Sequence, residues 1–154
     1  MNQASSPNRY SGLSIALHWV MLLLIAAVYA CMELREFYPK GSDIREGMKM
    51  WHFMLGLSVL ALVIVRIIVR LGRAAPAITP APPAWQNLSA KLIHLALYAM
   101  MILMPLAGWL ILSAEGKAIP FFGFELPALV SKNEELAELI EELHEAGGKI
   151  GYFL

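Results

Sequence analysis

The sequence has very little cysteine, with Cys31 the only one among 154 residues. A single thiol excludes an internal disulfide, a cysteine-rich zinc module and the Cys-x-x-Cys-His attachment of a c-type haem. Any cofactor must therefore be held by other side chains.

Charge is also scarce and carries no excess of either sign. Charged residues make up 16% of the chain, whereas about a quarter is usual in soluble domains. The 12 lysines and arginines balance the 12 acidic residues, so no positive field indicates a nucleic-acid partner. The 58% of hydrophobic residues instead predicts a protein of the lipid bilayer.

Three long apolar runs predict transmembrane helices at about 13–32, 51–70 and 91–113. Each run can cross the hydrocarbon core at about 1.5 Å per residue. The first lacks the basic start and small-residue cleavage site of a signal peptide, so we expect it to be retained. We interpret residues 1–12 as an N-terminal tail and 13–154 as one transmembrane domain.

The segments after the second and third runs differ in character. Residues 74–84 are rich in proline and alanine, which predicts an extended spacer. The acidic segment 133–143 has apolar residues at i, i+3, i+4 and i+7, which predicts an amphipathic helix. Residues 144–154 are too few to cross a bilayer. The expected fold is all-α, an integral membrane up-down four-helix bundle whose fourth helix, from about 133, is incomplete in this chain.

The four histidines are the most informative residues, because ionisable groups at membrane depth are costly. His18, His52, His94 and His144 each lie near the start of an expected helix. Since successive helices run in opposite directions, His18 and His94 should lie near one membrane face and His52 and His144 near the other. Imidazoles from two helices at one depth can supply both axial ligands of a haem iron.

Other roles for these histidines are open at this point. A histidine near a helix end is commonly an interfacial residue with wetted ring nitrogens. Zinc or copper binding is a further alternative, although a structural zinc site needs four ligands in one place and these four are divided between two faces.

Glycines close to the histidines fit a flat macrocycle. Gly56 follows His52 by one helical turn, and Gly147 and Gly148 follow His144. The missing side chains would let a porphyrin approach the backbone. Ordinary close packing of small residues between membrane helices explains them equally well.

Arginines lie at the far end of the second run. Arg66 and Arg70, four residues apart, share one face of the expected helix. Their guanidinium groups could pair with haem propionates or a quinone head group, or extend toward lipid phosphates.

Several segments together resemble the bacterial cytochrome b561 family of small membrane cytochromes. They are YSGLSIALHW (10–19), MELREFYP (32–39), WHFMLG (51–56), VRIIVR (65–70), HLALY (94–98), LMPLAG (103–108), LHEAG (143–147) and GYF (151–153). The resemblance implies a four-helix bundle with its N-terminus inside, in the bacterial inner (cytoplasmic) membrane, binding two b haems.

The resemblance also implies roles for particular histidines. His18 would be an axial ligand of the haem nearer the cytoplasm, and His52 with His144 would ligate the haem nearer the periplasm. The family's second ligand for the inner haem lies further along helix four than Leu154. We therefore expect one or two haems, because either the sequence is truncated, the inner haem is lost, or His94 is an additional ligand.

A haem with two histidine ligands suits one-electron transfer. We expect electron transfer across the membrane with a quinone as one partner, a donor that the sequence does not identify, and no separate catalytic residue. For some family members the resemblance implies superoxide-to-ubiquinone oxidoreductase activity. A haem-poor membrane anchor that docks a partner through helix 133–143 is an alternative of another class, and a homodimer is left open.

Overall fold

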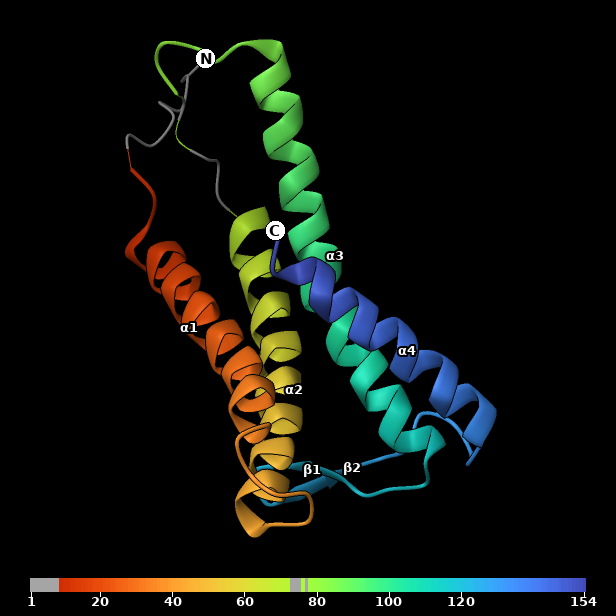
Figure 1. Cartoon of the computed structure of the whole chain (residues 1–154). Helices are drawn as coiled ribbons and strands as arrows, with labels where there is room; N and C mark the ends of the chain where they lie inside the picture. The colour runs from red at the N-terminus through yellow and green to blue at the C-terminus, as the bar shows by residue number, and fades with distance from the viewer. Residues whose placement is uncertain (1–8, 73–75, 77) are drawn as a thin grey trace.

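The computed structural model describes residues 9–72, 76 and 78–154, and consists of helices with one small hairpin. The helices are α1 (Gly12–Arg35), α2 (Asp43–Leu71), α3 (Ala84–Ala114) and α4 (Glu134–Gly151). The antiparallel strands β1 (Ile119–Phe121) and β2 (Phe124–Leu126) lie between α3 and α4 (Figure 1). Helices α1, α2 and α3 are long and apolar enough to cross a membrane. The protein is a helical membrane bundle.

The helix starts follow from side-chain caps. Ser11, Ser42 and Asn133 each accept a hydrogen bond from a backbone N–H in the first turn of α1, α2 and α4 respectively, as residues that favour N-caps do. Because Ser42 caps α2, that helix begins at Asp43 rather than near the predicted residue 51. The loop after α1 is correspondingly short.

Helix α3 begins directly after Pro83, seven residues before the predicted start at 91, because the proline-rich spacer ends there. Residues 73–75 and 77 of that spacer lie outside the described residues. Helix α4 continues without a break from the acidic segment through His144 to Gly151, so the amphipathic segment and the start of the fourth helix are one element. The hairpin was not predicted from the sequence.

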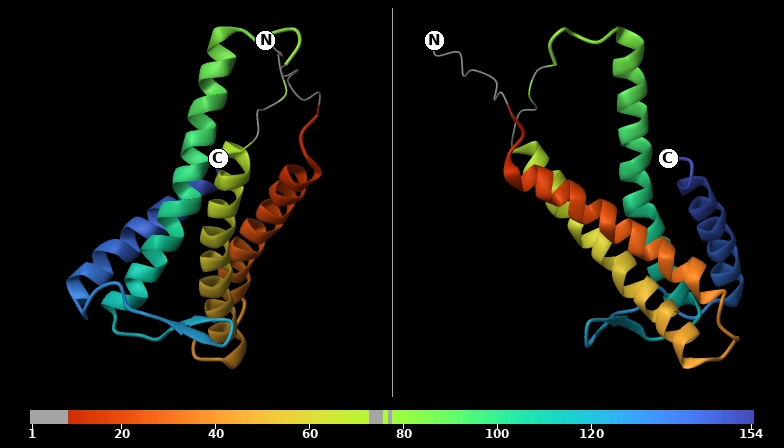
Figure 2. Two further views of the ribbon diagram at one scale, coloured as in Figure 1. Left: turned by 180° about the vertical axis from the view of Figure 1, so that it is seen from behind. Right: turned by 60° about the vertical axis from the view of Figure 1, so that its left-hand side comes forward.

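Helix α2 packs between α1 and α3, and α4 runs back obliquely across α3 (Figures 1 and 2). Two small clusters of buried side chains hold the helices together. One joins α1 to α2 and the other joins α2, α3 and the hairpin; their buried members are Met21, Val59 and Val63, and Leu57, Leu112 and Ile119. The hairpin therefore belongs to the core at one end of the bundle.

Three hydrogen bonds fix the path of the chain from α3 to α4. The Trp109 indole N–H donates to the Pro127 carbonyl at 3.0 Å, and the Leu129 N–H donates to the hydroxyl of buried Ser113 at 3.1 Å. The Asn133 N–H donates to the carbonyl of Ala114 at 2.8 Å. These contacts place the first turn of α4 beside the last turn of α3 and so set the depth of His144.

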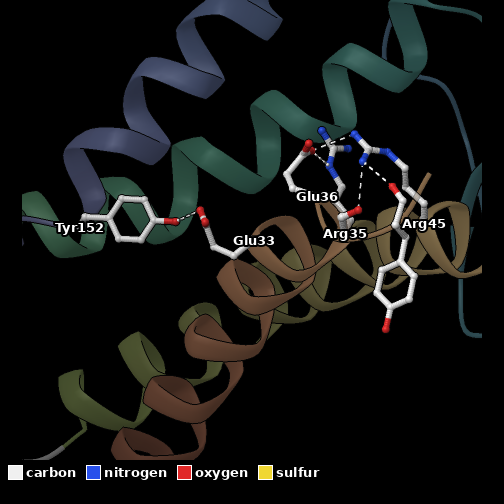
Figure 3. A network of polar contacts seen from close by, with 6 residues as sticks. Glu33, Arg35, Glu36, Arg45 and Tyr152 are labelled. Atoms are coloured by element: carbon white, nitrogen blue, oxygen red, sulfur yellow. Dashed lines mark hydrogen bonds and ion pairs between the residues drawn. The ribbon is translucent and has the colours of Figure 1, made fainter. Parts of the chain in front are cut away.

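Arg45 holds the short loop between α1 and α2 (Figure 3). Its Nη1 donates to the carbonyls of Arg35 and Tyr38, both at 3.0 Å, and its Nη2 lies 2.9 Å from the Glu36 carboxylate. Carbonyls in the last turn of a helix have no partner within the helix. One guanidinium therefore satisfies the end of α1 from the start of α2.

Replacing Arg45 with methionine should lower the free energy of unfolding by about 0.5–1.5 kcal/mol, because the half-buried carbonyl of Arg35 and the exposed carbonyl of Tyr38 lose their shared donor. Hydrogen bonding to Arg45 holds the pKa of Glu36 below its usual range. The stabilisation by the Arg45–Glu36 pair is fully present above the ordinary pKa of a glutamate carboxyl group. It is lost as the pH falls through the lowered pKa of Glu36. The loss of stability in the Arg45→Met variant, measured by thermal unfolding in lipid nanodiscs, should therefore be smaller in acid than at neutral pH.

A Lys40→Met control removes an exposed cation from the same loop and should leave stability unchanged. Equal stability of Arg45→Met and the parent would show that this guanidinium does not hold the loop.

Candidate functional site

The structure brings the imidazole rings of His52 in α2 and His144 in α4 close together, edge-on, in the wall of one cavity. Their ring centroids are 6.1 Å apart, with the ring planes 79° from parallel. Both side chains line a cavity of about 330 Å³, within the size range of cofactor sites. Two residues far apart in the sequence thus share one site.

The separation of the two rings matches that of two ligands on one metal ion. Metal–imidazole bonds are about 2.0–2.1 Å long, and a ring nitrogen lies roughly 1.1 Å from the ring centre. Two imidazoles on opposite sides of one metal ion therefore have their ring centroids roughly 6.2–6.4 Å apart. The observed 6.1 Å is close to this value, so the two side chains are near enough to hold one metal ion.

The hydrogen bond of His52 selects the tautomer needed for ligation. Its Nδ1 lies 3.1 Å from the carbonyl oxygen of Val28 in α1. Because a carbonyl only accepts, Nδ1 must carry the proton, and Nε2 keeps the lone pair that binds metal.

His144 is held less completely than His52. Its Nδ1 is buried and has no hydrogen-bond partner within residues 9–72, 76 and 78–154. A Cβ built on Gly108 of α3 would lie 3.6 Å from Cε1 of the His144 ring. Gly108 therefore lies directly beside this imidazole, and a methyl group there would make ordinary van der Waals contact with it.

The walls of the cavity are mainly apolar and come from all four helices and the hairpin. Gly56 lines it, and a Cβ built there would meet no atom within 4 Å. Gly148 also lines the cavity. Gly147 does not line the cavity, although the sequence interpretation placed it beside a macrocycle. Met104 occupies the space that a side chain at Gly147 would need, because a Cβ there would lie 2.6 Å from the Met104 sulfur. Gly147 therefore serves helix packing.

Residues at the rim of the cavity were missed by the sequence analysis. The Tyr29 hydroxyl donates to the Gly148 carbonyl at 2.9 Å, and the Tyr152 hydroxyl donates to Glu33 (Figure 3). The bond to Glu33 raises the pKa of Tyr152 to about 12. Tyr29 and Glu33 lie four residues apart at the end of α1 and therefore share one face of that helix. This spacing was the only feature of the sequence that could have indicated their role.

The other predicted residues lie elsewhere. His18 is exposed, and its Nδ1 is 3.3 Å from Nη1 of Arg66. His94 is exposed, with its Nδ1 2.7 Å from the Ala90 carbonyl of its own helix. No hydrogen bond or ring contact joins His18 to His94 within the described part of the chain. Neither Arg66 nor exposed Arg70 lines the cavity.

Among the described residues, no cluster of three or more histidine, cysteine, aspartate or glutamate side chains could hold a metal ion. A haem iron needs only two protein ligands, and His52 and His144 are a pair of histidines whose rings lie close together, with centroids 6.1 Å apart.

Tyr98 of α3 carries a hydroxyl group that is buried without a hydrogen-bond partner among the described residues. Replacing Tyr98 with phenylalanine should raise the free energy of unfolding by about 1 kcal/mol, because it removes the cost of an unsatisfied buried group. Tyr29→Phe is the matched control and should lower stability, because it removes the bond to Gly148. Denaturant unfolding of both variants in detergent measures the difference, and a destabilised Tyr98→Phe protein would contradict the prediction.

Comparison with known proteins identifies the family of this chain. The family model described as prokaryotic cytochrome b561 matches residues 9–154. Cytochrome b561 homolog 1 of Escherichia coli (strain K12) is 41% identical over 147 residues, which cover 96% of this chain and 84% of that protein. A protein of Yersinia pestis named probable superoxide oxidase CybB is 32% identical, covering 95% of this chain and 82% of its own length.

A match over nearly the whole chain, three membrane-spanning helices and a histidine pair in the wall of an apolar cavity agree with one another. The chain belongs to the prokaryotic cytochrome b561 family, and is a multi-pass bacterial membrane protein that binds haem b and transfers electrons.

Proposed function

We propose that the protein relays electrons through a b haem whose axial ligands are His52 and His144, and that it exchanges electrons with the quinone pool of the bacterial inner membrane. The observation that carries this proposal is the 6.1 Å separation of the two imidazoles in the wall of the cavity. Haem, when bound, would supply one-electron iron chemistry, and His52 and His144 would hold its iron, which would leave no free site for oxygen.

The protein contributes orientation and a dry environment. The Val28 carbonyl fixes the ring of His52, Gly56 leaves open space for a flat group, and the mainly apolar walls favour an apolar macrocycle. Burial and the hydrogen bonds of the ligands are the features by which a protein sets a haem potential.

A second haem site near the opposite membrane face is a weaker part of the proposal. His18 would be its ligand, with Arg66 and Arg70 directed to propionates or a quinone head group. The described residues bring no second histidine to His18. We therefore expect one haem per chain, unless His94 moves to complete the site.

Superoxide is the electron donor that the relatives favour, since the Yersinia pestis protein is named a probable superoxide oxidase. For this chain we propose that each superoxide is oxidised to O2 by giving one electron near the His52–His144 site, and that two such electrons, with two protons from water, reduce one ubiquinone to ubiquinol.

The visible spectrum and the number of haems per chain test the proposal. The purified protein in nanodiscs should show a b-type reduced-minus-oxidised difference spectrum and about one haem per chain in a pyridine haemochrome assay. With an enzymatic superoxide source, ubiquinone in the disc should be reduced in amounts that superoxide dismutase abolishes. A protein without haem would instead support the alternative of a membrane anchor that docks a partner through the acidic helix α4.

A further inference from the structure

The hairpin ends in exposed aromatic side chains. Phe122 is 51% and Phe124 is 76% exposed, whereas Ile119 at the base of β1 is buried against α2 and α3. The hairpin lies at the end of the bundle where α1 and α3 end and α2 begins (Figures 1 and 2). Its base closes the core there, and its tip keeps apolar surface exposed among the described residues.

The charge pattern of the spans places this end at the membrane surface. The uncharged stretch of α1 ends at Glu33, that of α2 begins after Lys49, and that of α3 ends before Glu115. All three boundaries lie at the hairpin end of the bundle. The ring of Phe122 packs edge-on against Trp51, with centroids 6.3 Å apart, and Trp51 lies two residues inside the boundary at Lys49. The tip is therefore at the depth where aromatic side chains favour the lipid–water interface.

The turn holds its aromatic residue in an unfavourable backbone conformation. Phe122 and Gly123 form a two-residue turn with φ values of +46° and +88°. Turns of this kind favour asparagine, aspartate or glycine, and a bulky residue with positive φ is a genuine outlier. A phenylalanine at this position presents an aromatic ring where the backbone alone would favour a small polar residue.

We propose that the hairpin is a membrane-interface anchor whose Phe122 and Phe124 rings lie in the boundary between lipid head groups and acyl chains. Because successive residues of a strand face opposite sides, Glu125 faces water while Phe124 faces lipid. The anchor holds Ile119 against the end of the cavity. This inference concerns lipid contact and does not depend on the haem ligands.

Site-directed spin labelling tests the proposal on the full chain in nanodiscs. The background variant Cys31→Ser removes the single cysteine, and labels are introduced separately at Phe124→Cys and Glu125→Cys. Leu103→Cys, exposed near the middle of α3, is the lipid reference, and Lys40→Cys in the loop after α1 is the water reference. Power saturation with oxygen and with a neutral nickel chelate then reports the depth of each label.

The ratio of oxygen to nickel collisions should be higher at Phe124 than at Glu125 and should fall between the two references. A ratio at Phe124 equal to that at Lys40 would place the tip in water and overturn the proposal. A label at Phe124 that neither reagent reaches would show that protein, such as a second copy of the chain, covers the tip, which would also overturn it. Circular dichroism equal to that of the background confirms that each labelled variant is folded.

Discussion

Loss of haem from the cavity is the expected result of replacing His52 with alanine. Haem affinity should fall by more than about 100-fold, because removing an outer-shell partner of a metal ligand already costs roughly 10–100-fold and this change removes the ligand itself. The measurement is haem content per chain after purification, together with the b-type difference spectrum. His144→Ala should have the same effect, since the two rings lie close together in the wall of one cavity.

His94→Ala is the control, because His94 is exposed and bonds only to its own helix. Adding imidazole to a His52→Gly variant should restore part of the spectrum by occupying the vacated axial position. Full haem content in His52→Ala would contradict the assignment of the ligand pair, and a loss of haem in His94→Ala would show that His94 is a ligand.

The variant Gly56→Leu should also prevent haem binding, although it keeps both histidines. A Cβ at Gly56 would meet no protein atom within 4 Å, and Gly56 lines the cavity, so the leucine side chain should extend into the space for the macrocycle. Removing a glycine from a helix stabilises it by about 0.5–1 kcal/mol, so the haem-free protein should be at least as stable as the haem-free parent. We therefore expect loss of the haem spectrum with no loss of stability, measured by haem content and by thermal unfolding of the apoprotein.

Gly47→Leu is the matched control, because Gly47 is also in α2, is also free of neighbours within 4 Å, and does not line the cavity. It should keep its haem. A Gly56→Leu protein that binds haem normally would show that the macrocycle does not occupy this cavity.

Much of the architecture could be predicted from local patterns. A run of about twenty uncharged apolar residues must lie in lipid and must satisfy its backbone internally, so helices over 13–32, 51–70 and 91–113 followed from length and composition alone. The alternating direction of the spans also placed His52 and His144 at one depth, and the structure brings these two rings together.

Details that depend on side-chain contacts were less accessible. The early start of α2 depends on Ser42 and on the bonds that Arg45 makes to the end of α1. The short strands of the hairpin contain few residues, and the backbone of Phe122 opposes the turn preference of its side chain. Neither the early start of α2 nor the hairpin produces a periodic pattern of apolar residues from which it could be predicted.

The sequence by itself determined that this is a helical membrane protein, because burial in lipid depends on each segment alone. The family resemblance implied that His52 and His144 belong to one site, and only the tertiary structure showed that their rings meet. Rotation of each helix about its axis and the path of α4 depend on contacts between distant residues, such as the bond of Tyr29 to Gly148 and that of Asn133 to Ala114. For the same reason Gly56 lines the cavity while Gly147 packs against Met104.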